Sequence, residues 1–382
     1  MSILKKVLLA LLGGFIVLNL YILLSGQSYI YHAIVSPGPE LDDYKLFYQR
    51  AIAASPNAQE WPLSLHYNEQ TLSNKLRKTL KENKSVSFLV IKNDSILHEE
   101  YFDGYGTSSL FSSASVAKAY VSTLVGIAIT EGYIESVEEP VANYLPSFKD
   151  EGKKNITIKH LLQMSSGLKW EASPVDPFSH TVEAYYVNDL RKMVDDMEPA
   201  YEPGQYYRYS DGDALALGLV VCEATGKKLS KLMESYFWHP QLIADSASWS
   251  LEKAGGMEKA FCCLNMTTRG FAYLGNLYLH QGIVKGSHVL DSAFIEAATA
   301  PSNLKKREDP DTRVDFFGYV WRPFTHESLG NLFYASGFLG QKIIVVPSQK
   351  MILVNIGNQN SDQVNNHPED LYVILDEVAK MF

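Results

Sequence analysis

Ser115 and Lys118 belong to an S-x-x-K tetrapeptide, Ser115-Val116-Ala117-Lys118, whose two polar side chains suit nucleophilic catalysis. Residues three apart lie on one face of a helix, so the Lys118 amine would lie beside the Ser115 hydroxyl. Burial lowers the pKa of a lysine, and we expect the Lys118 amine to accept the serine proton for that reason. A helix that begins at Ser115 would also favour the negative charge that develops during acyl transfer. The pair therefore indicates a nucleophilic serine.

The tetrapeptide is a weak signal alone, because S-x-x-K occurs five times, beginning at Ser2, Ser115, Ser166, Ser250 and Ser302. Only Ser115 lies between a small-residue turn at 112–114 and an apolar helical run at 116–129. The alternative is that Ser115 caps a helix and that Lys118 is a solvated side chain. The sequence has no G-x-S-x-G, H-E-x-x-H, Walker or G-x-G-x-x-G motif, which removes several common enzyme classes.

Composition limits the class of protein. The chain has 382 residues, of which 46% are hydrophobic and 20% charged, so it can bury a large core and is neither disordered nor a coiled coil. Its formal net charge of −9 argues against a nucleic-acid partner. The three cysteines predict neither a disulfide framework nor a zinc site, and we expect Cys262 and Cys263 to be small core residues. No metal-ligand spacing is present, and we expect no metal and no cofactor.

The N-terminus carries an apolar segment, Val7–Leu24, preceded by Lys5 and Lys6 and interrupted only by Asn19. At about 1.5 Å per residue such a run spans roughly 27 Å, close to the hydrocarbon core of about 30 Å. The lysines predict a cytoplasmic N-terminus and an extracytoplasmic remainder, periplasmic if the cell is Gram-negative. Cleavage near 26–28, as in a signal peptide, stays open as an alternative.

The remainder divides into a tether and one large domain. We expect residues 1–26 to be a transmembrane anchor or an uncleaved signal, 27–70 a tether, and 71–382 the functional domain. β-Branched and aromatic runs predict strands at 85–91, 95–102, 316–322, 332–336, 341–346 and 351–356. Residues 115–312 have a mostly helical pattern, and short helices are predicted at 72–81 and 368–381. This order predicts an α+β fold whose antiparallel sheet is built from both chain ends, flanked by helices, with a large helical insertion.

Five stretches follow one another in a pattern that a known superfamily shares. They are 111–118 (FSSASVAK), 141–146 (VANYLP), 156–167 (ITIKHLLQMSSG), 202–218 and 334–341 (YASGFLGQ). In these stretches the chain resembles the serine β-lactamase and penicillin-recognising superfamily, and in particular the class C β-lactamase-like hydrolases that include 6-aminohexanoate-dimer hydrolase and related esterases. The resemblance implies a β-lactamase/transpeptidase-like fold.

The resemblance also implies roles for individual residues. Ser115 corresponds to the acylated nucleophile, Lys118 to its proton-accepting partner, and Tyr209 to the general base or proton relay. A tyrosine can act in this way only if nearby cations stabilise its phenolate, and Lys118 is the natural candidate. Asp211 stands where the family usually has Asn or Ser. Its carboxylate could hold Lys118, and Asp211 is also a candidate for substrate binding. The backbone N–H groups of Ser115 and Phe338 correspond to the oxyanion hole.

A third family motif, K-T-G, corresponds here to Ala335-Ser336-Gly337. The family lysine that binds a substrate carboxylate is therefore missing, while Ser336 and Gly337 are expected to contact substrate. Asn265 is a further candidate for substrate binding. We expect acyl substrates without a carboxylate beside the scissile bond, unless Lys342 or Arg269 reaches the same place.

Together these features predict an extracytoplasmic serine hydrolase, anchored in the membrane, that cleaves a small ester or amide through an acyl-enzyme on Ser115. Within enzymes, the alternative is a D-Ala-directed peptidase or a true β-lactamase. Outside enzymes, the alternative is a non-catalytic penicillin-binding-like receptor or scaffold. His160 is expected to be a structural, hydrogen-bonded histidine.

Overall fold

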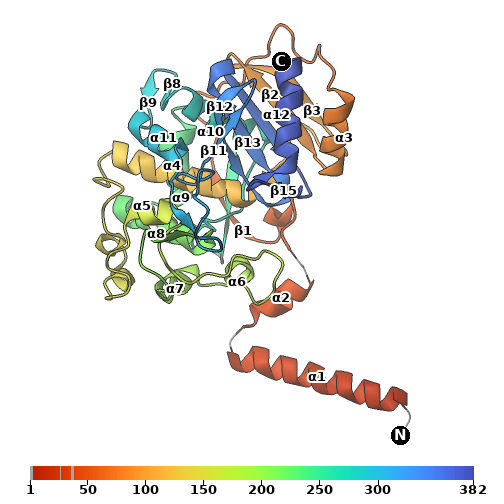
Figure 1. Ribbon diagram of the computed structural model, residues 1–382, viewed down its shortest axis with the longest axis vertical. Coiled ribbons are helices and arrows are strands. Elements are labelled where there is room, and N and C mark those ends of the chain that lie inside the picture. The colour runs from red at the N-terminus through yellow and green to blue at the C-terminus, as the bar shows by residue number, and fades with distance from the viewer. Residues whose placement is uncertain (1–2, 26, 36–37) are drawn as a thin grey trace.

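The computed structural model describes residues 3–25, 27–35 and 38–382. Its main sheet is antiparallel, with the strand order β11-β12-β13-β14-β2-β3 (Figure 1). The strands are β2 (Ser87–Lys92), β3 (Ser95–Tyr101), β11 (Arg322–His326), β12 (Gly330–Ser336), β13 (Lys342–Val346) and β14 (Met351–Ile356). Because β2 pairs with β14, the two ends of the domain meet in one sheet. The prediction of an antiparallel sheet built from both chain ends is confirmed.

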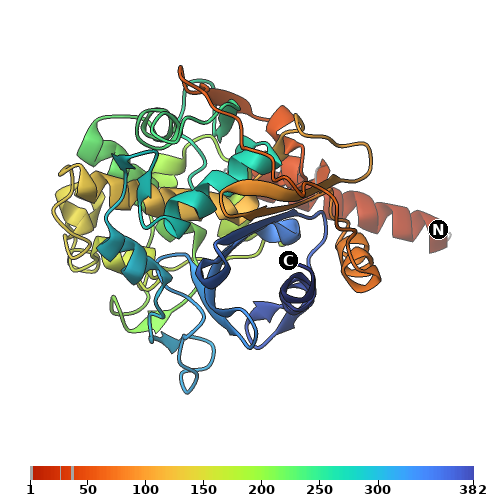
Figure 2. The same ribbon diagram turned by 90° about the horizontal axis from the view of Figure 1, so that it is seen from above.

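Helices cover both faces of this sheet, as the view from above shows (Figure 2). On one face α3 (Asn74–Glu82) and α12 (Glu369–Met381) pack against Phe88, Ile344 and Leu353. On the other face lies α10 (Thr268–Leu279). All side chains of β13 and β14 are buried as a result, which explains why their sequences are continuously apolar rather than alternating.

The second part of the domain is mostly helical and is built around α4 (Ala117–Thr130), which is buried along nearly its whole length. It packs against α8 (Asp211–Thr225), and the smaller helices surround this pair (Figure 1). These are α5 (Ile158–Leu162), α6 (His180–Tyr186), α7 (Leu190–Asp195), α9 (Leu229–Leu232) and α11 (Ser292–Thr299).

A second sheet, which the sequence analysis does not predict, has the order β1-β6-β7-β4. Its strands are β1 (Tyr48–Ile52), β6 (Ala247–Leu251), β7 (Leu264–Met266) and β4 (Phe111–Ser112). One member, β1, comes from the segment expected to be a tether, and it pairs antiparallel with β6. Two-residue pairings complete the strands: β5 (Tyr206–Tyr207) with β10 (Lys305–Lys306), β8 (Ile283–Val284) with β9 (Ser287–His288), and β15 (Gln363–Val364) with β16 (His367–Pro368).

The strand predicted at 316–322 is wrong, since β11 begins only at Arg322. The preceding residues are buried, but they form a local turn in which the Gly318 N–H donates to the Trp321 carbonyl at 2.8 Å. Val320 has a φ of +71°, which a strand does not allow. Residues 316–321 are apolar because they are buried, and this apolar run resembles a strand although the residues do not pair in the sheet.

The N-terminal helix α1 (Ile3–Ser25) points away from the body of the protein (Figure 1). Its length and composition suit either a membrane span or a signal sequence. A short helix, α2 (Tyr29–Val35), lies between α1 and the domain.

Candidate active site

Ser115 lies in the short 3₁₀ helix η2 (Ala114–Val116), which connects β4 to the N-terminus of α4. The preceding residue, Ala114, has a φ of +44°, a conformation that is uncommon for residues with a Cβ and that recurs at functional sites. Ser113 fixes this turn: its hydroxyl donates to the Ala114 carbonyl at 3.1 Å and accepts from the Leu264 N–H at 3.1 Å. The turn thus places Ser115 at the start of a buried helix.

Lys118 is buried directly beneath Ser115. Its Nζ donates to the Ser115 hydroxyl at 2.9 Å and to the Phe261 carbonyl at 2.7 Å. A third contact, at 2.7 Å, joins it to a carboxylate oxygen of Asp211. An ammonium group has three N–H donors, so these three partners satisfy the charged form of Lys118 completely.

The pKa of Lys118 is raised above its ordinary value, contrary to the expectation that burial lowers it. Burial does disfavour the ammonium, but the charge of Asp211 and the neighbouring Tyr209 outweigh it. The expectation that burial lowers the pKa of Lys118 is therefore wrong. In this arrangement Lys118 can donate a hydrogen bond or stabilise an anion, and it has no lone pair to accept a proton.

Tyr209 and Asp211 lie together at the N-terminus of α8, where the Ser210 hydroxyl caps the helix by accepting from the Asp213 N–H at 3.1 Å. Lys118 Nζ lies 5.1 Å from the centre of the Tyr209 ring. The second carboxylate oxygen of Asp211 accepts a hydrogen bond from the Thr181 hydroxyl. Asp211 lines the cavity, yet both of its oxygens already have partners within the protein.

The end of β12 lies against the backbone of Ser115. A Cβ atom on Gly337 would lie 2.8 Å from the Ser113 carbonyl oxygen and 3.2 Å from the Ser115 amide nitrogen, so only glycine allows this approach. Phe338 follows at once, and the backbone amides of Ser115 and Phe338 therefore belong to neighbouring segments. This proximity suits the pair of N–H donors that an oxyanion requires.

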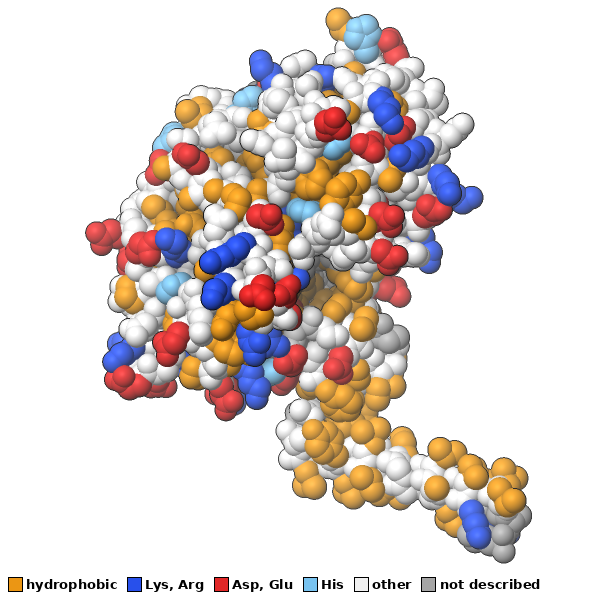
Figure 3. Space-filling model, in the orientation of Figure 1, with side chains coloured by type: hydrophobic (Ala, Val, Ile, Leu, Met, Phe, Trp, Pro, Cys, Tyr) orange, Lys and Arg blue, Asp and Glu red, His pale blue; other side chains and the backbone are white. Residues whose placement is uncertain are grey.

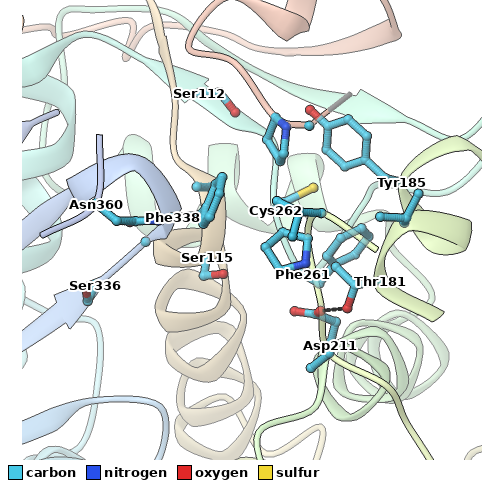
Figure 4. Close-up of a pocket in the computed structure, with 18 of the residues that line it drawn as sticks. Ser112, Ser115, Thr181, Tyr185, Asp211, Phe261, Cys262, Ser336, Phe338 and Asn360 are labelled. Atoms are coloured by element: carbon cyan, nitrogen blue, oxygen red, sulfur yellow. Dashed lines mark hydrogen bonds between the residues drawn. The ribbon is translucent and has the colours of Figure 1, made fainter. Parts of the chain in front are cut away.

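The predicted residues surround one cavity of about 560 Å³, within the range of small-molecule sites (Figure 4). Ser115 lies at its base, with Phe338 on one side and Phe261 and Cys262 on the other (Figure 4). The structure brings six of the predicted side chains or glycines together at this cavity: Ser115, Tyr209, Asp211, Ser336, Gly337 and Phe338. Lys118 contacts Ser115 from below.

Asn265 is the one predicted residue that lies elsewhere, because it does not line the cavity. Its side-chain amide donates to Gln49 at 3.0 Å, to Ser250 at 3.2 Å and to the Cys263 carbonyl at 3.1 Å. These contacts hold β7 against its neighbours, and the geometry gives no support to a role in substrate binding. His160 has the expected structural place, since its ring accepts from the Thr157 N–H in a capping box at the start of α5.

Neither cation named as a substitute for the missing K-T-G lysine is free. Lys342 lines the cavity, but its Nζ lies 2.6 Å from a carboxylate oxygen of Asp370, and both side chains are buried. Arg269 is bound to Glu99 through two contacts of 2.6 and 2.8 Å. Ala335 is buried in the core and supplies no charge.

Arg322 is a cavity residue that the sequence analysis missed. It opens β11, directly opposite Tyr334 of β12. Burial tends to lower its pKa, but the phenol groups of Tyr334, Tyr207 and Tyr209 raise it above the ordinary value. No carboxylate among residues 3–25, 27–35 and 38–382 forms an ion pair with it. Arg322 is thus a cation in the cavity lining that the sequence analysis did not name.

Cys262 and Cys263 are buried as expected, but they are joined in a disulfide between adjacent residues. Both line the cavity, directly after Phe261, whose carbonyl accepts from Lys118. The expected burial in the core is confirmed, and the disulfide is a feature that the sequence analysis does not predict. Because Cys262 and Cys263 are adjacent in the sequence, their spacing gives no signal from which this disulfide could be predicted.

Known proteins resemble this chain both in sequence and in structure. The sequence matches the family described as beta-lactamase over residues 72–376, and the chain belongs to this family. It is 24% identical to 6-aminohexanoate-dimer hydrolase from Paenarthrobacter ureafaciens over 298 residues, which cover 74% of this chain and 75% of that protein. The chain is a hydrolase of this family.

Solved structures support the fold. One from Bacillus anthracis superposes with a TM-score of 0.74 at 20% identity, over 89% of this chain and 92% of that chain. A family VIII carboxylesterase superposes with a TM-score of 0.64 at 17% identity, over 84% of this chain and 99% of that chain. The expected β-lactamase/transpeptidase-like fold is thereby confirmed.

Proposed function

We propose that this chain is a membrane-anchored, extracytoplasmic serine hydrolase that cleaves an ester or amide through a covalent acyl-enzyme on Ser115. The observation that carries the proposal is the 2.9 Å contact between Lys118 Nζ and the Ser115 hydroxyl at the base of a cavity of about 560 Å³. Residues 1–26 would be the anchor and 27–70 the tether of the domain at 71–382.

In the proposed reaction, the Ser115 oxygen attacks the carbonyl carbon and its proton passes to the Tyr209 oxygen. Lys118, held as an ammonium by Asp211, and Arg322 provide the positive charge that stabilises the phenolate. The carbonyl oxygen becomes an oxyanion and receives the backbone N–H groups of Ser115 and Phe338. Tyr209 then returns the proton to the leaving oxygen or nitrogen, and a water molecule activated in the same way releases the acid.

A second candidate is a hydrolase for substrates that carry a carboxylate, such as a D-Ala-directed peptidase or a β-lactamase. Arg322 favours this candidate, because it lines the cavity and forms no ion pair in the part of the chain that the structure describes. Charge-assisted bonds from a guanidinium suit a carboxylate well. A non-catalytic scaffold is the least favoured, since such a protein has no need for the Ser115, Lys118 and Tyr209 cluster.

Labelling with a fluorophosphonate followed by peptide mapping tests the proposal. We expect one covalent adduct, on Ser115, and no adduct or turnover of p-nitrophenyl acetate in Ser115→Ala. Ser302→Ala is a matched control, because Ser302 begins another S-x-x-K tetrapeptide but lies outside this cavity. Substantial esterase activity in Ser115→Ala would show that the nucleophile lies elsewhere.

A further inference from the structure

The cavity above Ser115 is bounded on one side by the segment that follows the N-terminal apolar helix. Ala33 and Ile34 of α2, and then Gly38 and Pro39, line the same cavity as Ser115. The part of the chain that would emerge from a membrane is therefore also one wall of the site. A bound substrate would lie close to the end of α1.

This wall is packed onto the domain. Tyr29, Ile30 and Ala33 of α2 are buried in a small apolar cluster with Val182 of α6 and Ile22 of α1. The His32 ring stacks on Tyr186, with ring centres 6.0 Å apart. The contacts join α1, α2 and α6 and so fix the cavity opening relative to the end of the apolar helix.

Apolar side chains are exposed on both elements that bound the opening. On α2 these are Tyr31, Ile34 and Val35, and Val35 is 84% exposed. On the loop before α6 they are Val175 and Phe178, which is 56% exposed. We call these five residues the apolar rim. Figure 3 shows apolar side chains continuing from α1 over α2 to the body of the protein.

Exposed apolar side chains that gather beside a cavity mark a surface that binds lipid or another apolar partner. Here the gathering lies next to a helix that is apolar enough to cross a membrane, and lipid is the partner that this helix would bring near. The loop between Ala172 and Pro177 adds Pro174 and Val175 to the cavity lining, so the apolar character continues from the rim inward.

We propose that the substrate is a membrane amphiphile, whose long hydrocarbon chain passes over the apolar rim and into the cavity while its ester or amide carbonyl reaches Ser115. This inference rests on the proposed function, because it needs a reactive Ser115. The polar end of the amphiphile lies toward the sheet, where Arg322 and Ser336 line the cavity. The hydrocarbon chain of the amphiphile replaces water along Ile34 and Val175.

The test uses the full chain reconstituted in phosphatidylcholine vesicles, with p-nitrophenyl acetate, octanoate and palmitate as substrates. Full burial of one methylene raises kcat/KM about fourfold, so burial of only about three of the additional methylenes of octanoate is enough for the gain that we expect over acetate, at least about 30-fold. The variant Val35→Asp/Phe178→Asp alters two rim residues that do not line the cavity. We expect it to lose at least about tenfold on palmitate and less than about twofold on acetate.

The control variant is Leu65→Asp/Ile283→Asp, which places the same charges on two exposed apolar residues away from this cavity. It should behave like the unaltered protein. Equal turnover of all three esters, or an equal loss on acetate and palmitate in the rim variant, would overturn the inference and leave Ser115 chemistry intact. Acetate turnover that survives in Ser115→Ala would instead refute the proposed function.

Discussion

Replacing Asp211 by Asn removes one charge from a buried ion pair while keeping the shape of the side chain. Asp211 lies 2.7 Å from Lys118 Nζ, and both side chains are almost fully buried. An uncompensated buried charge typically costs about 3–5 kcal/mol. We therefore expect Asp211→Asn to lower the free energy of unfolding by about that amount at pH 7.

The cost has an upper limit that depends on pH, because Lys118 can release its proton instead of remaining charged. Its pKa in the unfolded chain is about 10.4, and each pH unit corresponds to about 1.4 kcal/mol. Deprotonation therefore limits the cost to about 5 kcal/mol at pH 7 and about 2 kcal/mol at pH 9. In the variant the folded pKa of Lys118 is depressed, so the unfolded chain binds more protons in this window and stability rises with pH relative to the unaltered protein.

The measurement is guanidinium unfolding of the full chain in detergent at pH 7, 8 and 9, followed by tryptophan fluorescence. The stability deficit of Asp211→Asn should shrink steadily across this series. A deficit that stays constant with pH, or a variant as stable as the unaltered protein at pH 7, would refute the assignment of Lys118 as a charged group held by Asp211.

The remaining predictions concern other groups. Burial raises the pKa of Asp213 to about 7, and its second carboxylate oxygen has no hydrogen-bond partner in the described chain. Asp213→Asn should therefore add about 1–3 kcal/mol to the free energy of unfolding at pH 8 and nothing at pH 4. Equal gains at both pH values would contradict this prediction. Tyr209→Phe should lose at least about 10²-fold in kcat/KM on p-nitrophenyl acetate, and near-normal turnover would exclude a role in proton transfer. Arg322→Gln should reduce kcat/KM for a carboxylate-bearing ester more than for its methyl ester, whereas equal losses would show that Arg322 does not bind the carboxylate. If the N-terminal helix is an anchor, sequencing of the mature protein should find no new start near Tyr29.

Regular elements were predictable because their apolar patterns are local. The strands at 85–91 and 351–356 lie close to β2 and β14, and the helix predicted at 368–381 differs from α12 by one residue. The second sheet was not predicted, because β4 has two residues and β7 three, too few for a pattern. Such strands depend on partners far away in the sequence.

The candidate site also divides into residues that a local motif predicts and residues whose place depends on partners far away in the sequence. Ser115, Lys118 and Tyr209, which the structure brings together, could be proposed from the sequence because each belongs to a short motif whose order the family resemblance supplies. Arg322 was missed because its place depends on pairing between β11 and β12, which puts it opposite Tyr334. The direction of the Lys118 pKa shift was mistaken although a contact with Asp211 was considered, because the balance between burial and a neighbouring charge depends on distances that only the folded structure sets.

The pairing of β2 with β14 has a consequence for when the protein becomes active during its synthesis. Ser115 and Lys118 are made early, but Phe338, Gly337 and Arg322 belong to segments that are synthesised last. A chain that has emerged only as far as α10 has the proposed nucleophile, Ser115, without the strand end that lies against its backbone. Hydrolytic activity should therefore appear only after the C-terminal strands have left the ribosome and joined the sheet, so that a nascent or truncated chain carries no reactive site.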